Sequence, residues 1–452
     1  MTRLFPRPSE YRRDALRTNL WLVPTIGVLG AGLLFAATYL VDCQAFAGRL
    51  KLPAWTDNGS SDAARQILIG IAAAVITVVG LVFSVTIVAL TLASTQFGPR
   101  MLRNFVRDRG TQATLGTLVA TFVFAVLALG SIAHGDQGDF VPHLSITVSL
   151  GLLLVALGVL IYFIHHVATM IQLPRVIASI ASDLAAAIEA EMGTRRARTV
   201  GAELGPSVAE IETRLATDGV IIPASSSGYL QFVAYDRLVD IATRSEGVMR
   251  LLHRPGHFVV EGLPLAAVWP PETAPRFLHQ LKRAHVTGPH RTLAQDLAFA
   301  IDQLVEIAIR ALSPAVNDTF TAIACIDWLT DTICKITAQW DPPTVHRDTL
   351  GNIRVLAAEI RLERFVERAF DQIRQSGRGM PAILIRQLDG LERIARYTGT
   401  DAHRAVLIDQ ADMILRNSTE SIPEPADRAD VRHRYDAFRA AATSPGTRQT
   451  LG

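Results

Sequence analysis

The chain has 452 residues, which is enough for two or three domains, and 44 Lys and Arg against 42 Asp and Glu. This balance leaves a net charge of only +2, so neither nucleic acid nor an acidic polymer is predicted as a partner. The three cysteines, Cys43, Cys325 and Cys334, include no C-x-x-C pair, and no disulfide framework is predicted. The hydrophobic fraction of 49% is high for a soluble protein, and the excess lies before residue 175.

Charged residues are absent from four stretches in the first part of the chain, 18–41, 66–99, 110–135 and 140–174. Each stretch exceeds the roughly 20 apolar residues that a helix needs to cross a hydrocarbon core. The sequence therefore predicts an α-helical membrane domain over 1–172, embedded in the lipid bilayer. Its four spans are predicted at about 20–41, 66–95, 112–133 and 143–168.

Among the segments outside these spans, those rich in arginine alternate with those that are not. The tail before residue 18 has five arginines and the segment 98–111 has four, whereas His134–His143 has acids and no Lys or Arg. Basic segments stay on the cytoplasmic side of a membrane. Both termini, and the large carboxy-terminal domain, are therefore predicted to be cytoplasmic.

The second span has a repeating pattern of residues at intervals of three and four, which places them on one helix face. These residues are Thr77, Gly80, Ser84, Val88, Thr91 and Thr95. A face rich in small and hydroxylated residues allows helices to pack closely. Alternatively, it lines a water-filled path when several copies gather around an axis. Both interpretations stay open at the level of sequence.

Gly98-Pro99 ends this helix, and three arginines follow at its predicted cytoplasmic mouth: Arg100, Arg103 and Arg107. A ring of arginines favours anions, although the orientation rule requires basic residues there in any case.

His165-His166 at the end of the fourth span is typical of an interfacial anchor, with a pH sensor or metal site as the alternative. The outer loop has a conceivable metal set, although no metal site is predicted: His134, Asp136, Asp139 and His143.

After Arg175 charged residues return, and three soluble regions follow. Residues 173–217 are predicted as a helical connector, and 218–285 as a small β-rich module of four or five short strands, with a compact barrel as one arrangement. Residues 286–452 are predicted as a bundle of five or six helices. Two sets of residues there keep helical spacing: Leu350, Ile353, Ala357 and Ile360, and Leu384, Leu388, Leu391 and Ile394.

The most distinctive polar segment begins at His290 and ends near Ala322. Glu306 and Arg310 are predicted to pair at i,i+4, and Asn317 or Asp318 is predicted to cap the helix that follows Ser313-Pro314. One interpretation is structural, with caps and ion pairs locking two helices. The other is a ligand pocket in which Arg291 binds an anion and carboxylates act as acceptors or metal ligands. The candidate pocket residues are Arg291, Asp296, Asp302, Glu306, Asn317 and Asp318.

Several of these segments together resemble one protein family. They are Phe83–Arg100 (FSVTIVALTLASTQFGPR), Arg291-Thr292, Gln295-Asp296, Ala311–Pro314, and Asn317-Asp318 with Phe320–Ala322. This combination resembles the bacterial predicted membrane protein family catalogued as domain of unknown function 2254. The resemblance implies an inner-membrane protein with several spans and a cytoplasmic carboxy-terminal domain, and it implies no particular activity. Thr319 stands where the family tends to have Pro, which weakens pre-organisation of the following helix.

No catalytic motif occurs in the sequence: there is no P-loop, no G-x-S-x-G, no H-E-x-x-H and no G-x-G-x-x-G before a helix. Neither an enzyme nor a cofactor is predicted, and catalysis at Asp302, Glu306 and Asp318 is the least favoured hypothesis. A homo-oligomeric passive channel or channel-like transporter with a cytoplasmic regulatory domain is favoured, because coupled carriers place ionisable residues inside the membrane. The alternative is a membrane-anchored sensor or scaffold whose cytoplasmic domain binds a ligand or partner.

Overall fold

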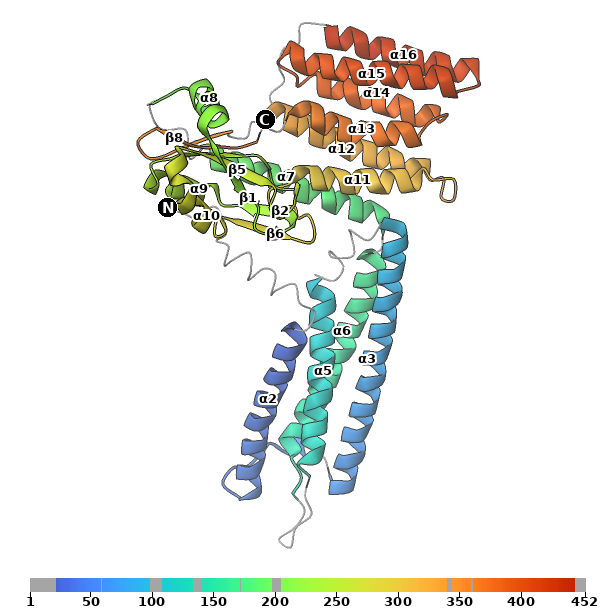
Figure 1. The fold of residues 1–452 in the computed structure, drawn as a ribbon. Coiled ribbons are helices and arrows are strands. Elements are labelled where there is room, and N and C mark those ends of the chain that lie inside the picture. Colours follow the sequence, from blue (N-terminus) through green and yellow to red (C-terminus); the bar gives the residue numbers. More distant parts are fainter. Residues whose placement is uncertain are drawn as a thin grey trace. The chain divides into compact units, whose positions relative to one another are not determined.

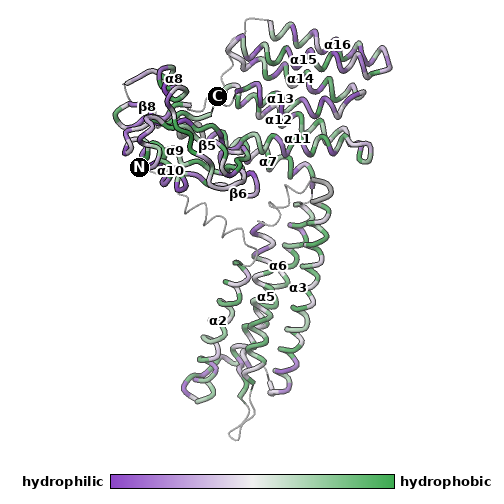
Figure 2. Tube along the Cα trace, viewed as in Figure 1, coloured by the Kyte–Doolittle hydropathy of each residue, from purple (hydrophilic) through white to green (hydrophobic). Residues whose placement is uncertain are grey.

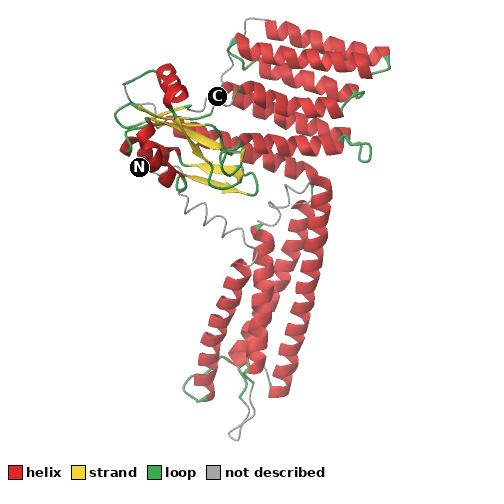
Figure 3. Ribbon diagram, in the orientation of Figure 1, coloured by secondary structure: helices red, strands yellow, loops and turns green. Residues whose placement is uncertain are grey.

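The computed structural model describes residues 22–57, 59–97, 108–132, 140–170, 172–196, 205–339, 344–358 and 361–443. The described part is mostly helical, and the chain divides into two compact units (Figure 1, Figure 3). The four-helix unit lies within Arg12–Arg175, and the sheet-and-bundle unit runs from Val176 to Gly452.

Four helices of the first unit are long and apolar enough to cross a bilayer, which confirms their predicted number (Figure 2). They are α2 (Leu22–Phe46), α3 (Ser61–Phe97), α5 (Arg109–Gly130) and α6 (His143–Met170), with the 3-10 turn η1 (Ala54–Thr56) after α2. The Ser60 hydroxyl accepts a hydrogen bond from the Ala63 backbone N–H at 3.3 Å and starts α3 earlier than predicted. With 37 residues, α3 is about 55 Å long, well beyond a hydrocarbon core of ~30 Å.

Within the four-helix unit, α5 contacts α2, α3 and α6. Glycines allow the close approach of α2 and α5, since a Cβ atom on Gly27 would lie 2.9 Å from the Gly116 carbonyl oxygen. A buried carboxylate joins α2 to α6: Asp42 is 2% exposed and accepts backbone N–H groups of Leu144 and Ser145 at 2.8 and 3.0 Å. Asp42 therefore caps the first turn of α6, a role that no local sequence pattern indicated.

The second unit has two sheets. A five-stranded sheet has the order β1-β5-β3-β8-β7, and a three-stranded sheet has the order β4-β2-β6. The strands are β1 (Val220–Pro223), β2 (Gly228–Val233), β3 (Val248–Leu251), β4 (Phe258–Val259), β5 (Pro264–Trp269), β6 (His285–Gly288), β7 (Val345–Arg347) and β8 (Ile353–Leu356). Strands β3 and β8 pair in parallel, with Met249 opposite Val355, and the other pairs are antiparallel.

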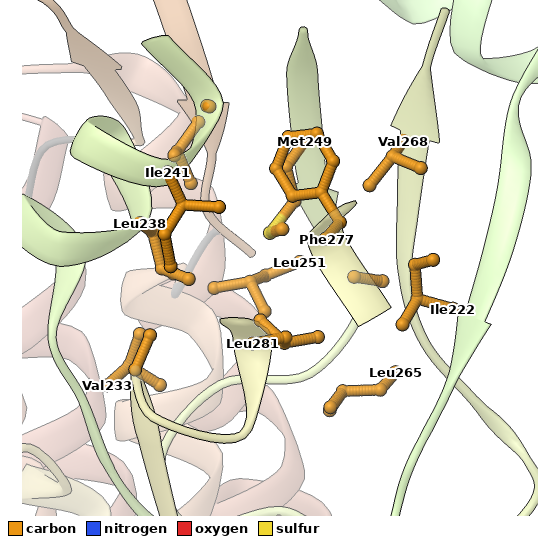
Figure 4. Packing of buried hydrophobic residues seen from close by; sticks show 14 of the residues in the cluster. Ile222, Val233, Leu238, Ile241, Met249, Leu251, Leu265, Val268, Phe277 and Leu281 are labelled. Atoms are coloured by element: carbon orange, nitrogen blue, oxygen red, sulfur yellow. The ribbon is translucent and has the colours of Figure 1, made fainter. Parts of the chain in front are cut away.

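The two sheets share one hydrophobic core with short helices (Figure 4). The helices of this region are α7 (Leu173–Arg196), α8 (Val208–Asp218), α9 (Tyr235–Arg244), η2 (Pro271–Thr273) and α10 (Ala274–Leu281). Leu238 and Ile241 of α9 and Phe277 and Leu281 of α10 pack with Met249 of β3, and all five are at most 5% exposed. Burying each such side chain contributes roughly 1.5–3 kcal/mol, so this core fixes the strands and the turns between them.

The barrel arrangement was wrong. Five strands, β1 to β5, lie within 218–285, which confirms the predicted number, and β6 begins at the end of this range. These strands belong to two open sheets. Strand β5 pairs with β1 and β3, whereas β2 pairs with β4 and β6, and no pair of described strands joins the two sheets. A closed barrel needs such a pair.

The helix predicted from residue 350 to residue 360 was also wrong, because β8 occupies Ile353–Leu356; Ile360 lies outside the described residues. The chain turns at Gly351, whose φ is +87°. The Asp348 carboxylate supports this turn by accepting the backbone N–H groups of residues 350 and 352, each at 2.9 Å. Pairing with β3 and β7 then places Val355 in the core, and this tertiary contact outweighs a short helical period.

The carboxy-terminal helices form a bundle, six in the described part of that region. They are α11 (Leu297–Ala311), α12 (Thr319–Gln339), α13 (Leu362–Ser376), α14 (Pro381–Ala395), α15 (Asp401–Ser421) and α16 (Pro425–Thr443). Helix α11 contacts α12 and α13, α12 contacts α14, α13 contacts α15, and α14 contacts α16. The predicted apolar stripe of α14 is fully buried: Leu384, Leu388, Leu391 and Ile394.

Candidate functional site

The two faces of α3 differ in their side chains. The face that packs on α5 and α6 has Val75, Val79 and Val82, each at most 7% exposed. The described members of the predicted stripe are exposed instead: Thr77, Gly80, Ser84, Val88 and Thr91. The stripe is therefore not the surface by which α3 packs on the described helices of its own chain.

Polar groups of the stripe bond locally. Thr77 Oγ1 donates to the Ala73 carbonyl at 2.8 Å, and Thr91 Oγ1 donates to the Ile87 carbonyl at 2.9 Å. These bonds satisfy the hydroxyl hydrogens and leave acceptor oxygens on the surface. A Cβ atom on Gly80 would meet nothing within 4 Å. The stripe is thus a polar surface with room for a neighbour.

Several predicted site residues lie outside the described residues. They are the side chain of Thr95, the mouth arginines Arg100, Arg103 and Arg107, and the loop residues His134, Asp136 and Asp139. His143 of the same loop set lies 3.8 Å from Asp57. Within the described ranges, no three His, Cys, Asp or Glu side chains gather as metal ligands.

The two histidines at the end of α6 have different surroundings. His166 Nε2 lies 2.9 Å from an oxygen of Asp108, and its ring stacks on Tyr162 with centroids 5.3 Å apart, whereas His165 is exposed. Asp108 also caps α5, accepting the Thr111 backbone N–H at 2.6 Å. Burial raises the pKa of Asp108, but the bonds from Thr111 and His166 outweigh burial and hold that pKa below its ordinary value. The Asp108–His166 pair therefore joins α5 to α6.

In the sheet-and-bundle unit, Arg291 is bound by two carboxylates. Its Nε and Nη2 donate to the two oxygens of Asp296 at 2.7 and 3.0 Å, and its Nη1 donates to Asp302. Arg368 of α13 donates to both oxygens of Asp302 at 2.7 and 2.6 Å. Burial lowers the pKa of Arg291, but Asp296 and Asp302 outweigh burial and raise it. The charge of Arg291 is thus neutralised by its own chain.

The segment that carries Arg291 is also held to β2. The Gln295 side chain bonds both backbone groups of Val233: its Oε1 accepts the N–H at 2.8 Å, and its Nε2 donates to the carbonyl at 3.0 Å. Gln231 Nε2 donates to the His290 carbonyl at 2.6 Å. Because this segment connects β6 to α11, these contacts attach the three-stranded sheet to the bundle. Arg291, Gln295 and Asp296 have a structural role.

The remaining candidate pocket residues lie toward the other end of α11. Arg310 Nη2 donates to Glu306 Oε1 at 3.4 Å, which confirms the predicted pair. Asp318 caps α12 by accepting the Thr321 backbone N–H at 3.1 Å, and hydrogen bonds from Thr321 lower the pKa of its carboxyl. Asn317 has a φ of 50°, a left-handed conformation that Asn tolerates. The sequence thus located this turn and its cap.

The candidate pocket residues do not form one site. The Asp318 backbone N–H donates to the Ala311 carbonyl at 2.7 Å, which places Asp318 at the carboxy-terminal end of α11. Between Asp302 and Ala311 the helix rises about 13 Å. Arg291, Asp296 and Asp302 therefore cluster at one end of α11, and Asn317 and Asp318 lie at the other.

Sequence reasoning missed a partner of this cluster in the turn after β3. Arg254 Nε donates to His257 Nε2 at 3.0 Å. Burial and, after it, the nearby charges of Arg254, His253, Arg291 and Arg368 together lower the pKa of His257 to about 4. About 35 residues of sequence separate this turn from Arg291, and a local spacing pattern cannot predict a contact between residues so far apart in the chain.

The four apolar helices and the separate unit with two sheets define a class, a multi-span membrane protein with a large mixed α and β unit. The chain belongs to the family described as predicted membrane protein (DUF2254), whose model matches residues 17–393, and this confirms the resemblance. Uncharacterised proteins of Mycobacterium tuberculosis and Mycobacterium bovis are each 31% identical over 457 residues, covering 96% of this chain and 82% of the relative. No solved structure matches the chain.

Proposed function

We propose that this protein is an oligomeric passive channel, or channel-like transporter, of the bacterial inner membrane, and that α3 lines its path. The sheet-and-bundle unit and both termini lie in the cytoplasm, in keeping with the arginines of the tail and of 98–111. That unit regulates opening. The observation that carries the proposal is the exposure, in the single chain, of Thr77, Gly80, Ser84 and Thr91.

A hydroxylated helix face is unfavourable against lipid tails, since hydrocarbon offers its oxygens no hydrogen-bond donors. A second copy of the chain or a column of water removes this cost. Gly80 and Ser84 are small residues four positions apart, so they leave room for water along this face, and neither is used for packing within the described chain. An oligomer that gathers the α3 helices around an axis therefore accounts for residues that do not pack within one chain.

The path is passive because its helix has no ionisable side chain in the membrane. No Asp, Glu, Lys or Arg occurs between Gln66 and Phe97. Coupled carriers use such residues to bind and release protons or ions. The buried Asp42 of α2 is engaged as the cap of α6 and is not available for transport.

The proposal is tested by chloride and potassium flux into liposomes that hold the purified full-length protein. Ser84→Leu fills the path and is expected to reduce flux while the subunit number is unchanged. Gly158→Leu is the matched control, because Gly158 is an exposed residue of α6 whose added Cβ would also meet nothing within 4 Å. It should leave flux at the wild-type level.

A preference for chloride would support a role for Arg100, Arg103 and Arg107 at the mouth. A folded, oligomeric preparation that passes neither ion would contradict the channel. It would favour a membrane-anchored sensor or scaffold and move attention to the sheet-and-bundle unit. Equal flux in wild type, Ser84→Leu and Gly158→Leu would instead contradict the proposal that α3 lines the path.

A further inference from the structure

A groove lies on the helical bundle, away from every residue singled out by sequence. Its volume is about 330 Å³, and it is formed where α13 and the turn after it meet α15. The lining residues are Arg374, Gln375, Arg378, Met413, Arg416, Asn417 and Glu420. A volume of this size is at the lower end of the range for small-molecule sites.

Positive charge dominates the groove, with three guanidinium groups against one carboxylate in its lining. Arg378 Nη2 lies 3.7 Å from Glu420 Oε2, and both side chains are more than half exposed, so this pair is weak. No acidic side chain of the described chain lies within ion-pair distance of Arg416. Arg378 and Arg416 therefore keep most of their capacity to bind an anion.

Arg374 provides the second observation. Its side chain is 14% exposed, and its Nη2 lies 3.3 Å from Asp371 Oδ1, an oxygen that also accepts from Gln410 Nε2 at 3.1 Å. The Arg374 Nε is buried and has no hydrogen-bond partner among the described residues. A buried N–H of a charged group is costly to leave unpaired, so the Arg374 guanidinium keeps capacity for a further acceptor.

We propose that this groove binds a soluble, phosphate-bearing small molecule of about nucleotide size. Arginine is the residue best suited to phosphoryl oxygens, because its planar fork donates two parallel hydrogen bonds. Arg378 and Arg416 hold the phosphoryl group, and Met413 gives the groove an apolar wall for the rest of the ligand. Gln375 and Asn417 supply neutral hydrogen-bonding groups.

The position of Arg378 is fixed by the fold. Gly377 ends α13, and Gly379 has a φ of +77°. The Gly379 backbone N–H donates to Ser421 Oγ at 2.9 Å, which holds this turn against the end of α15. Because the backbone of this turn is held, less conformational entropy is lost when Arg378 binds a ligand.

Calorimetric titration of inorganic pyrophosphate into the full-length protein, in nanodiscs of phosphatidylcholine at constant ionic strength, tests this proposal without any flux measurement. One site per chain is expected. Arg416→Ala and Arg378→Ala should each weaken binding by about tenfold or more, since each removes a charge-assisted hydrogen bond. Arg416→Lys keeps the charge but loses the fork, and it should weaken binding by a smaller factor.

Arg432→Ala is the matched control, because Arg432 is an exposed arginine of α16 outside the groove. It should bind pyrophosphate as the wild type does. Arg378 and Arg416 are themselves exposed, so an unchanged melting temperature will show that their variants are folded. The proposal is overturned if pyrophosphate does not bind, or if Arg432→Ala weakens binding as much as Arg416→Ala. It is also overturned if the groove variants change only the preference for nanodiscs containing phosphatidic acid.

Discussion

The polar residues of α3 and those around Arg291 are equally prominent in the sequence, but the fold uses them in opposite ways. Around Arg291, each charged group of the cluster meets a partner in the same chain, and Asp296 is only 6% exposed. On α3, the hydroxylated and small residues are exposed, and a Cβ atom on Gly80 would meet no atom within 4 Å. The comparison separates polar residues that the fold of one chain requires from those that it leaves exposed on the surface.

This difference has a measurable consequence. Replacing residues that bond within the chain is expected to lower stability. Replacing residues left on the surface is expected to change assembly or transport at unchanged stability. The bundle groove belongs with α3 in this respect, since its arginines are incompletely paired.

The largest loss of stability is expected for Arg291→Ala. It leaves the buried Asp296 without its ion-pair partner and Asp302 with Arg368 alone, and breaking a buried ion pair on one side costs about 3–5 kcal/mol. Urea unfolding of the full-length protein in detergent measures this change. Arg364→Ala is the control, because that side chain is 71% exposed and its pair with Glu367 should contribute at most about 0.5 kcal/mol. An equal loss of stability in the two variants would show that the ion pairs of Arg291 do not stabilise the fold.

Gln295→Ala should have the next largest effect. It removes the two hydrogen bonds that the Gln295 side chain makes with the backbone N–H and carbonyl of Val233, a residue only 1% exposed. The expected loss in the free energy of unfolding is about 1–3 kcal/mol. Gln372→Ala, an exposed position on α13, should change the free energy of unfolding by less than about 0.5 kcal/mol. Hydrogen exchange at Val233 gives a second measurement, and unchanged protection there would contradict the proposed link between β2 and the 290–296 segment.

A smaller effect depends on pH and on His257. Its pKa is about 4 in the folded chain, against about 6.5 when unfolded, so the unfolded chain binds the extra proton between these values. Stability should therefore fall as the pH drops from about 6.5 to about 4 and should level off below that. Arg254, His253, Arg291 and Arg368 surround this imidazole, and the nearby Asp296 opposes them only in part.

His257→Gln should flatten that part of the stability profile, whereas His433→Gln, at an exposed position on α16, should leave the slope unchanged. Melting temperatures measured from pH 4 to pH 7 provide the comparison. A His257→Gln profile as steep as that of the wild type would rule out the proposed environment of this side chain.

The smallest effect is expected for Phe320→Ala. Phe320 belongs to the family-like segment after Asn317-Asp318, yet it is 86% exposed, so its removal should cost less than about 0.5 kcal/mol. Phe277→Ala, which removes a fully buried ring from the core, should cost about 3–5 kcal/mol. A large loss of stability for Phe320→Ala would mean that another part of the protein covers this ring.

The sequence was sufficient for features that depend on local order. Four stretches without charged residues predicted the four apolar helices, and helical spacing predicted the buried stripe of α14. Asp318 could be predicted as a cap because the break at Ser313-Pro314 lies just before it. Each of these signals lies within a few residues of the feature that it predicts.

Features that depend on distant partners could not be predicted in this way. Asp42 caps a helix that begins about 100 residues later, and Gln295 bonds a strand about 60 residues earlier. Strand β8 is a strand because β3 and β7 lie on either side of it. The exposure of the α3 stripe likewise required the packing of α5 and α6 to be known. Sequence spacing identified its residues but left both of its interpretations open.

The central claim is that the α3 stripe faces a water-filled path. The most direct test is the reaction of a water-soluble thiol reagent with Ser84→Cys and with Gly158→Cys, in full-length protein in liposomes with Cys43 replaced by Ala. Cysteine reacts as a thiolate, which forms in water and not in lipid. The account predicts that Ser84→Cys is modified and Gly158→Cys is not. Equal protection of both positions in an oligomeric protein would contradict it.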